Sequence, residues 1–125
     1  MKSFEELECW KIGAEIRREV SRLVKKLPSQ EKFALVSQML RCSRSATNNI
    51  AEGYGRFHYQ ENAQFCRHAR GSLYELIDHL IICFEEQYID QTLFEKLKSK
   101  CFNCIKILNG YIKYLLEAKM NQQKS

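Results

Sequence analysis

Apolar residues recur every three or four positions along almost the whole chain, which is the period of an α-helix. Breaks in this pattern divide it into four stretches, and each stretch has one wide apolar face. The pattern therefore predicts four long helices, over residues 3–26, 29–53, 60–87 and from residue 90 onward.

Residues at the ends of the stretches support this division. Ser3 is suited to cap the first helix, with Glu6 three residues later completing a capping box. Ser29 and Asp90 are suited to cap the second and fourth helices. The two glycines within residues 53–55 are expected to end the second helix, because glycine reaches the left-handed conformation that closes a helix.

Four helices with apolar faces and short connections favour antiparallel neighbours. The predicted fold is all-α, an antiparallel up-down-up-down four-helix bundle that forms one domain over residues 1–125, a length typical of a single domain. The predicted core positions are Leu7, Trp10, Ile12, Ala14, Ile16, Val20, Leu23, Val24, Leu27, Phe33, Val36, Met39, Leu40, Ala46, Ile50, Phe65, Ala69, Leu73, Leu76, Leu80, Phe84, Leu93, Leu97, Cys101, Cys104, Leu108, Tyr111 and Leu115.

Composition narrows the class of protein further. No apolar run reaches the roughly 20 residues that a membrane span needs. The first six residues turn acidic where a signal peptide would be apolar, so we expect a cytoplasmic protein. Six cysteines are scattered through apolar faces, and we expect reduced, buried thiols and not a disulfide framework.

Basic residues are unevenly placed within a net charge of +5. On the first helix, spacings of seven, four and three residues put four of them on one outward stripe, and the second helix adds a fifth. These residues are Lys11, Arg18, Arg22, Lys25 and Arg44. Such a stripe suits nucleic-acid phosphates.

The connection after the second helix combines cations with rings that can stack on unpaired bases. Its candidate residues are Tyr54, Arg56 and Phe57. The alternative is an ordinary solvated surface, because Glu15 and Glu19 each precede an arginine by three residues, the spacing of a surface ion pair.

A polar seam is predicted between the second and third helices. Its members are Arg41, Ser45, Asn49, Glu52, Ser72 and Glu75. Pairing of Arg41 with Glu75, or of Asn49 with Ser72, would satisfy these groups if they are buried. One interpretation of the seam is structural: it fixes the register of the two helices or a contact between subunits. The other is that it contacts a ligand or RNA.

Metal and enzyme chemistry find little support in the sequence. Glu75 and His79 are four residues apart and could share a metal, but bundle sites of this type need Glu-x-x-His elements and the chain has none. No phosphate-binding glycine loop and no Ser/His/Asp arrangement is present. We therefore expect no catalytic residues, no metal and no cofactor.

Two elements of the central helices together resemble a known family. They are N-I-A-E-G at residues 49–53 and G-S-L-Y-E at residues 71–75. With the flanking positions they resemble the 23S rRNA-intervening-sequence proteins, bacterial four-helix bundles, some of them encoded in an insertion within the 23S ribosomal RNA gene. The flanking positions are Phe4, Leu7, Trp10, Leu35 to Gln38, Arg41, Ser45, Arg56, Ala69, Leu108 and Tyr111.

The resemblance implies a homo-oligomer, a ring of five bundles, and it implies no catalytic residues. A more distant relative, the accessory protein of diversity-generating retroelements, is a similar basic bundle that binds nucleic acid. We therefore predict a non-enzymatic homo-oligomer that binds ribosomal RNA or single-stranded nucleic acid through its basic faces. The alternative is a protein-interaction or structural scaffold with no nucleic-acid partner.

Overall fold

The computed structural model describes residues 3–124, and in this range it contains helices and no strand. Three short 3-10 segments, Phe4–Glu6, Val24–Lys26 and Ser29–Glu31, accompany the long helices. The α-helices are α1 Glu8–Leu23, α2 Leu35–Tyr54, α3 Tyr59–Glu85 and α4 Gln91–Lys124.

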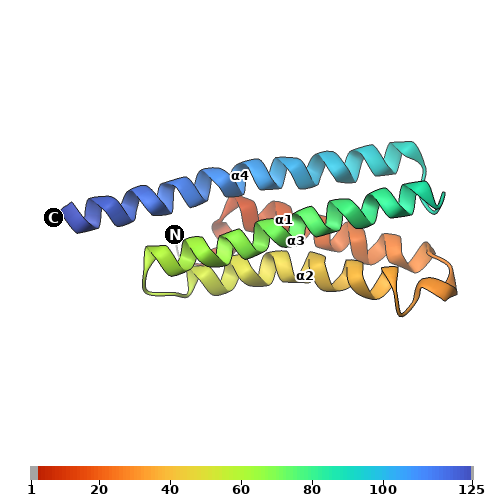
Figure 1. Ribbon diagram of the computed structural model, residues 1–125, viewed down its shortest axis with the longest axis horizontal. Helices are drawn as coiled ribbons and strands as arrows, with labels where there is room; N and C mark the ends of the chain where they lie inside the picture. The colour runs from red at the N-terminus through yellow and green to blue at the C-terminus, as the bar shows by residue number, and fades with distance from the viewer. Residues whose placement is uncertain (1–2, 125) are drawn as a thin grey trace.

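Successive helices run in opposite directions and lie side by side, and α4 continues past the end of the bundle (Figure 1). Helix α1 packs against α2 and α4, and α3 packs against the same two helices from the other side. The all-helical four-helix fold is confirmed. No helix in the described part of the chain is long and apolar enough to cross a membrane.

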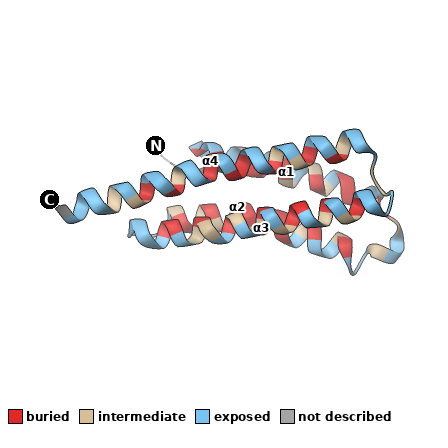
Figure 2. Cartoon of the chain, turned by 45° about the horizontal axis from the view of Figure 1, so that its top comes forward, coloured by how far each residue is buried: buried red, intermediate tan, exposed pale blue. Residues whose placement is uncertain are grey.

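Buried residues line the inner faces of all four helices (Figure 2). All six cysteines are free and buried, as predicted. Burial raises the pKa of each thiol, to about 12 for Cys104, so the thiols are protonated near neutral pH in the absence of a metal. Two predicted core residues are exposed. Phe33 precedes α2 and is 88% exposed, and Phe84 near the end of α3 stacks on Phe94 at the surface.

Two helix starts differ from the sequence prediction. The Ser3 hydroxyl accepts a hydrogen bond from Glu5 N at 3.1 Å, but it caps a 3-10 turn that ends at Leu7. Leu7 is extended, with ψ 130°, so α1 begins one residue later. Similarly, Ser29 opens a 3-10 segment and α2 begins only at Leu35.

The predicted cap at Asp90 is confirmed, since its Oδ1 accepts a hydrogen bond from Leu93 N at 2.8 Å. The reason proposed for the two glycines at the end of α2 is wrong, since Gly53 still belongs to the helix and only Gly55 follows it. Gly55 has φ −77° and is not left-handed. Gly53 instead permits close packing of α2 on α3, because a Cβ there would lie 2.7 Å from Asn62 Oδ1 and 2.9 Å from the Phe65 Cβ.

The bundle is uneven at the end where α2 turns into α3. The Cys104 thiol of α4 contacts the Cys9 carbonyl near the start of α1, at 3.4 Å. Residues of α4 beyond this level, including Tyr111 and Tyr114, therefore extend past the start of α1. This leaves an opening that three helices surround.

Candidate nucleic-acid interface

The predicted basic stripe lies on the outer side of α1. Lys11, Arg18, Arg22 and Lys25 are all exposed, as their spacing requires. Within residues 3–124 none of them forms an ion pair, and neither does Arg44 of α2. Their charges are therefore available to an anionic partner.

The acids of α1 do not neutralise this stripe, contrary to the alternative drawn from the sequence. Glu19 lies 3.2 Å from Lys96 Nζ and 3.4 Å from Lys100 Nζ, both on α4. Glu15 lies 3.6 Å from Lys100 Nζ. Both acids thus project toward α4. A spacing of three residues permits an ion pair along a helix, but here the lysines of the neighbouring helix form the pairs.

A groove between α1 and α2 continues the stripe toward the second helix. It has a volume of about 510 Å³ and is lined by Arg17, Arg18, Ser21, Arg44 and Asn48. Three guanidinium groups and two neutral polar side chains line it, with no carboxylate. A groove lined by one sign of charge concentrates the potential and attracts counter-ions.

Arg17 is the groove residue that the sequence prediction missed. Its Nη1 donates to the Thr47 hydroxyl at 2.8 Å, and its guanidinium lies 5.6 Å from the centre of the Trp10 ring. These contacts fix the side chain across the contact between α1 and α2. Gly13 allows that contact, since a Cβ there would lie 3.1 Å from the Thr47 methyl group.

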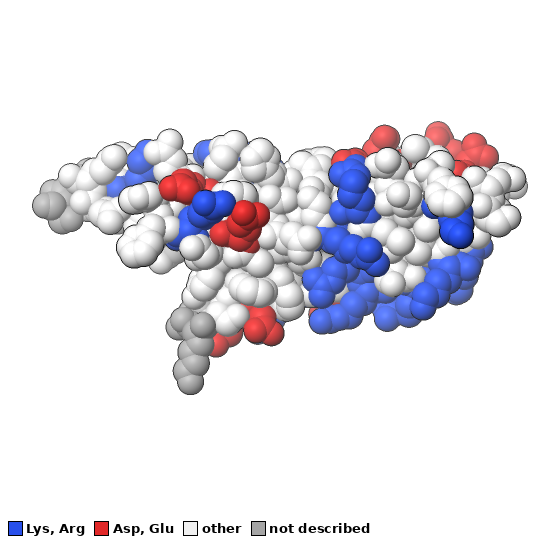
Figure 3. Space-filling view, turned by 90° about the horizontal axis from the view of Figure 1, so that it is seen from below, with Lys and Arg blue, Asp and Glu red and all other residues white. Residues whose placement is uncertain are grey.

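Lys and Arg side chains gather over one half of the face that α1 and α2 present, while acidic side chains lie toward its other end and along one edge (Figure 3). Guanidinium groups bind phosphate through two parallel hydrogen bonds, which makes the arrangement suited to a phosphate backbone.

An aromatic pocket fills the opening at the uneven end of the bundle, with a volume of about 450 Å³. Tyr111 and Tyr114 of α4 stack at 6.2 Å between ring centres, with the planes 13° apart. The Tyr111 hydroxyl accepts a hydrogen bond from Asn62 Nδ2 at 3.1 Å. Burial raises the pKa of Tyr111 to about 12, so the hydroxyl stays neutral. The pocket is lined by Leu7, Tyr54, Arg56, Phe57, His58, Tyr59, Asn62, Tyr111, Tyr114 and Leu115.

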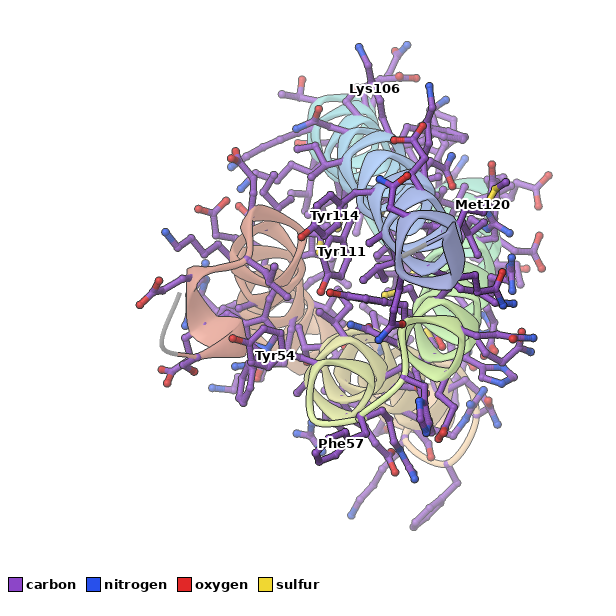
Figure 4. The ribbon with its side chains drawn as sticks, turned by 90° about the vertical axis from the view of Figure 1, so that its left-hand side faces the viewer. Tyr54, Phe57, Lys106, Tyr111, Tyr114 and Met120 are labelled. Atoms are coloured by element: carbon purple, nitrogen blue, oxygen red, sulfur yellow. The ribbon has the colours of Figure 1, made fainter. Side chains whose placement is uncertain are left out.

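Tyr54 at the end of α2 and the loop residues Arg56 and Phe57, all predicted to bind nucleic acid, differ in their surroundings. Tyr54 and the α4 tyrosines lie near one another, whereas Phe57 points outward and is fully exposed (Figure 4). Arg56 is not a free cation, because it lies 3.0 Å from Glu52 and 3.9 Å from Glu61. The aromatic residues therefore contribute more to this pocket than the loop cation does.

The polar seam exists in part. Arg41 pairs with Glu75, as predicted, and the two side chains are 56% and 36% exposed. Asn49 and Ser72 do not meet directly: Ser72 donates to the Ser45 hydroxyl at 3.1 Å, and Asn49 donates to the same oxygen at 3.0 Å. Glu52 turns away from the seam to Arg56, so the seam is a half-exposed contact between α2 and α3.

Cys42 was not identified from the sequence as a metal-binding side chain beside the polar seam. Cys42 of α2 lies beside Glu75 and His79 of α3, and one ligand atom of each lies within 4.8 Å of the others. Spacing along one helix shows Glu75 and His79 as a pair, but it cannot show a residue contributed by the neighbouring helix.

The geometry defines a class of protein: a small helical bundle with an unneutralised basic face and an aromatic pocket at one end. Residues 5–110 match the family described as 23S rRNA-intervening sequence protein, and the chain belongs to this family. A similar solved structure is a protein of unknown function from the S23 ribosomal protein family of Bacteroides thetaiotaomicron. It shares 22% identity with a TM-score of 0.78, over 84% of this chain and 95% of that one. No curated protein matches the chain.

Proposed function

We propose that the protein binds single-stranded RNA, ribosomal RNA in particular, without catalysing a reaction on it. The observation that carries the proposal is the groove between α1 and α2, where Arg17, Arg18 and Arg44 converge and no acid lines the walls. The family description supports ribosomal RNA as the first partner to test.

The aromatic pocket supports a single strand over a duplex. The bases of a single strand are free to stack on protein rings, whereas in a duplex they stack on each other. Asn48 of α2 lines the groove, and Tyr54 of the same helix lines the pocket. Six residues of helix rise by about 9 Å and turn by about 240°, so a strand that contacts both sites must also pass around α2.

The experiment is a fluorescence-anisotropy titration with a labelled ribosomal RNA fragment, in single-stranded and duplex forms. Single-stranded RNA is expected to bind with higher affinity than the duplex. Replacing Arg18 and Arg44 by Gln is expected to weaken both forms, because each presents phosphates to the groove, and to weaken all sequences alike, because phosphates carry no sequence information. Absence of binding at 50 mM salt, where electrostatic binding is strong, contradicts the proposal.

We also propose that the chain forms a homo-oligomer, the five-membered ring that the family resemblance implies. Ile77 of α3 is buried in the chain's own core, and the Tyr88 hydroxyl, just after α3, donates to Glu31 at 2.8 Å. Exposed apolar side chains remain on α3 and α4, and they are candidates for a subunit contact. Those outside the aromatic pocket are Tyr74, Ile81, Phe84, Phe102 and Met120.

Light scattering at micromolar concentration tests this assembly. A mass that is a multiple of the 14.8 kDa chain is expected, and a sharp monomer mass contradicts it. In a ring, identical basic faces would add their affinities for one long RNA by multivalency.

A further inference from the structure

Three metal-binding side chains converge where the middle of α2 faces the middle of α3. Cys42 comes from α2, and Glu75 and His79 come from successive turns of α3. Within the part of the chain that the structure describes, no other group of three Cys, His, Asp or Glu ligands lies as close together. This cluster lies outside the basic groove and the aromatic pocket.

We propose that Cys42, Glu75 and His79 bind a divalent transition-metal ion, preferably Zn²⁺, with water completing the coordination. A thiolate, an imidazole and a carboxylate are all ligands that zinc takes, and three protein ligands with a water form an open site. The thiolate favours zinc over magnesium or calcium, which prefer oxygen ligands.

The spacing of the ligand atoms fits this ion. His79 Nε2 lies 3.2 Å from Glu75 Oε2. Two such atoms, each about 2.0–2.1 Å from zinc in a tetrahedron, are separated by about 3.3 Å. Cys42 Sγ lies within 4.8 Å of both, and a Zn–S bond of about 2.3 Å would bring it about 1 Å closer.

Few existing interactions oppose this movement. The Cys42 thiol is fully buried and donates only to the Met39 carbonyl, at 3.6 Å. His79 Nδ1 is buried and has no hydrogen-bond partner within residues 3–124, so a small shift of the ring toward Cys42 breaks no hydrogen bond at this nitrogen. Arg41, the other partner of Glu75, is 56% exposed and also donates to Gln38 at 2.8 Å, so it can move away and keep a partner.

The charges balance when the metal is bound. The thiol loses its proton to solvent as the sulfur–metal bond forms, so one thiolate and one carboxylate neutralise the divalent ion. The ion would then connect α2 to α3 at the centre of their contact. Metal binding is therefore expected to raise the melting temperature, because the ion binds the folded chain and not the unfolded one.

The test is a titration of untagged, reduced protein with Co²⁺, a spectroscopic substitute, followed by Zn²⁺. One equivalent of Co²⁺ is expected to produce a thiolate-to-cobalt band in the near ultraviolet, which Zn²⁺ then removes. Cys42→Ser and His79→Gln are each expected to lower the affinity by more than about 100-fold, beyond the effect of losing an outer-shell partner.

Cys66→Ser is the matched control, because Cys66 is an equally buried thiol of α3 outside the cluster. Its metal affinity is expected to match that of the wild type. Circular dichroism checks that each variant folds, and His79→Gln decides the question if Cys42→Ser does not. Absence of the band at one equivalent, or an equal loss in the control, overturns the proposal.

Discussion

The two long sides of α1 both adjoin basic residues, but only one side has acids to pair with them. Toward α4, Glu15 and Glu19 lie 3.2–3.6 Å from Lys96 and Lys100. Toward α2, Arg17 and its neighbours line a groove without a carboxylate. The overall charge of +5 therefore does not show which basic side chains are free, whereas the distribution of ion pairs does.

The largest expected effect comes from reversing charge in the groove. Arg18→Glu with Arg44→Glu removes two contacts to phosphate, each worth about 1.5–3 kcal/mol. RNA affinity should fall by at least about 100-fold, as measured by anisotropy at constant salt. The control is Lys106→Glu with Lys113→Glu, which makes the same change of net charge at exposed positions of α4. Lys106 points away from the aromatic pocket (Figure 4). An equal loss of RNA affinity in this control would show that only the total charge of the protein matters.

A second variant separates stacking from charge. Phe57→Ala should weaken single-stranded RNA by about 1–3 kcal/mol, the value of one base–aromatic stack. Duplex RNA should be affected little. The melting temperature should not change, since the Phe57 side chain is fully exposed. Equal losses for single strand and duplex would mean that this ring does not stack on a base.

A third variant removes the ion pairs between α1 and α4, which leaves two lysines of α4 without acidic partners. Glu15→Gln with Glu19→Gln should release Lys96 and Lys100 from their acids. If free basic charge is what creates a binding face, RNA affinity should rise, and the slope of log affinity on log salt should steepen by up to about 1.4. Unchanged binding would indicate that the shape of the groove matters more than free charge.

The smallest effect is expected at the polar seam, where a charge pair is already half exposed. With metal removed, Glu75→Ala should lower the free energy of unfolding by less than about 1 kcal/mol, because Arg41 can be hydrated. The exposed fractions of 56% and 36% are the reason. A loss of about 3 kcal/mol or more in thermal or urea unfolding would show instead that assembly buries the pair.

Features that depend on one helix could be predicted from the sequence. The apolar period located the core, and the cap at Asp90 and the outward direction of Arg18 followed from local rules. Contacts between helices could not be predicted in this way. The approach of Arg17 to Thr47 and of Cys42 to His79 depends on how α1 and α3 are placed against α2, which periodicity does not specify.

Two aspects of charge pairing also escaped prediction. The spacing of Glu15 and Glu19 suggested pairs within α1, but the lysines of α4 lie closer to these carboxylates. Arg56 looked like a free cation in a loop, yet Glu52 one turn earlier and Glu61 both lie within 4.0 Å. The acids Glu15 and Glu19 are thus paired by a neighbouring helix, whereas Arg56 is paired in part by a residue four positions earlier, a spacing that the sequence shows.

The most direct test of the account is the salt dependence of RNA binding by three proteins: the wild type, Arg18→Gln with Arg44→Gln, and Lys96→Gln with Lys100→Gln. Each phosphate contact on a single strand contributes about −0.7 to the slope of log affinity on log salt. The arginine variant should flatten the slope by about 1.4, and the lysine variant should leave it unchanged because its charges are already paired with acids. Equal flattening in both variants, or no salt dependence in the wild type, would contradict the assignment of the groove between α1 and α2 as the binding face.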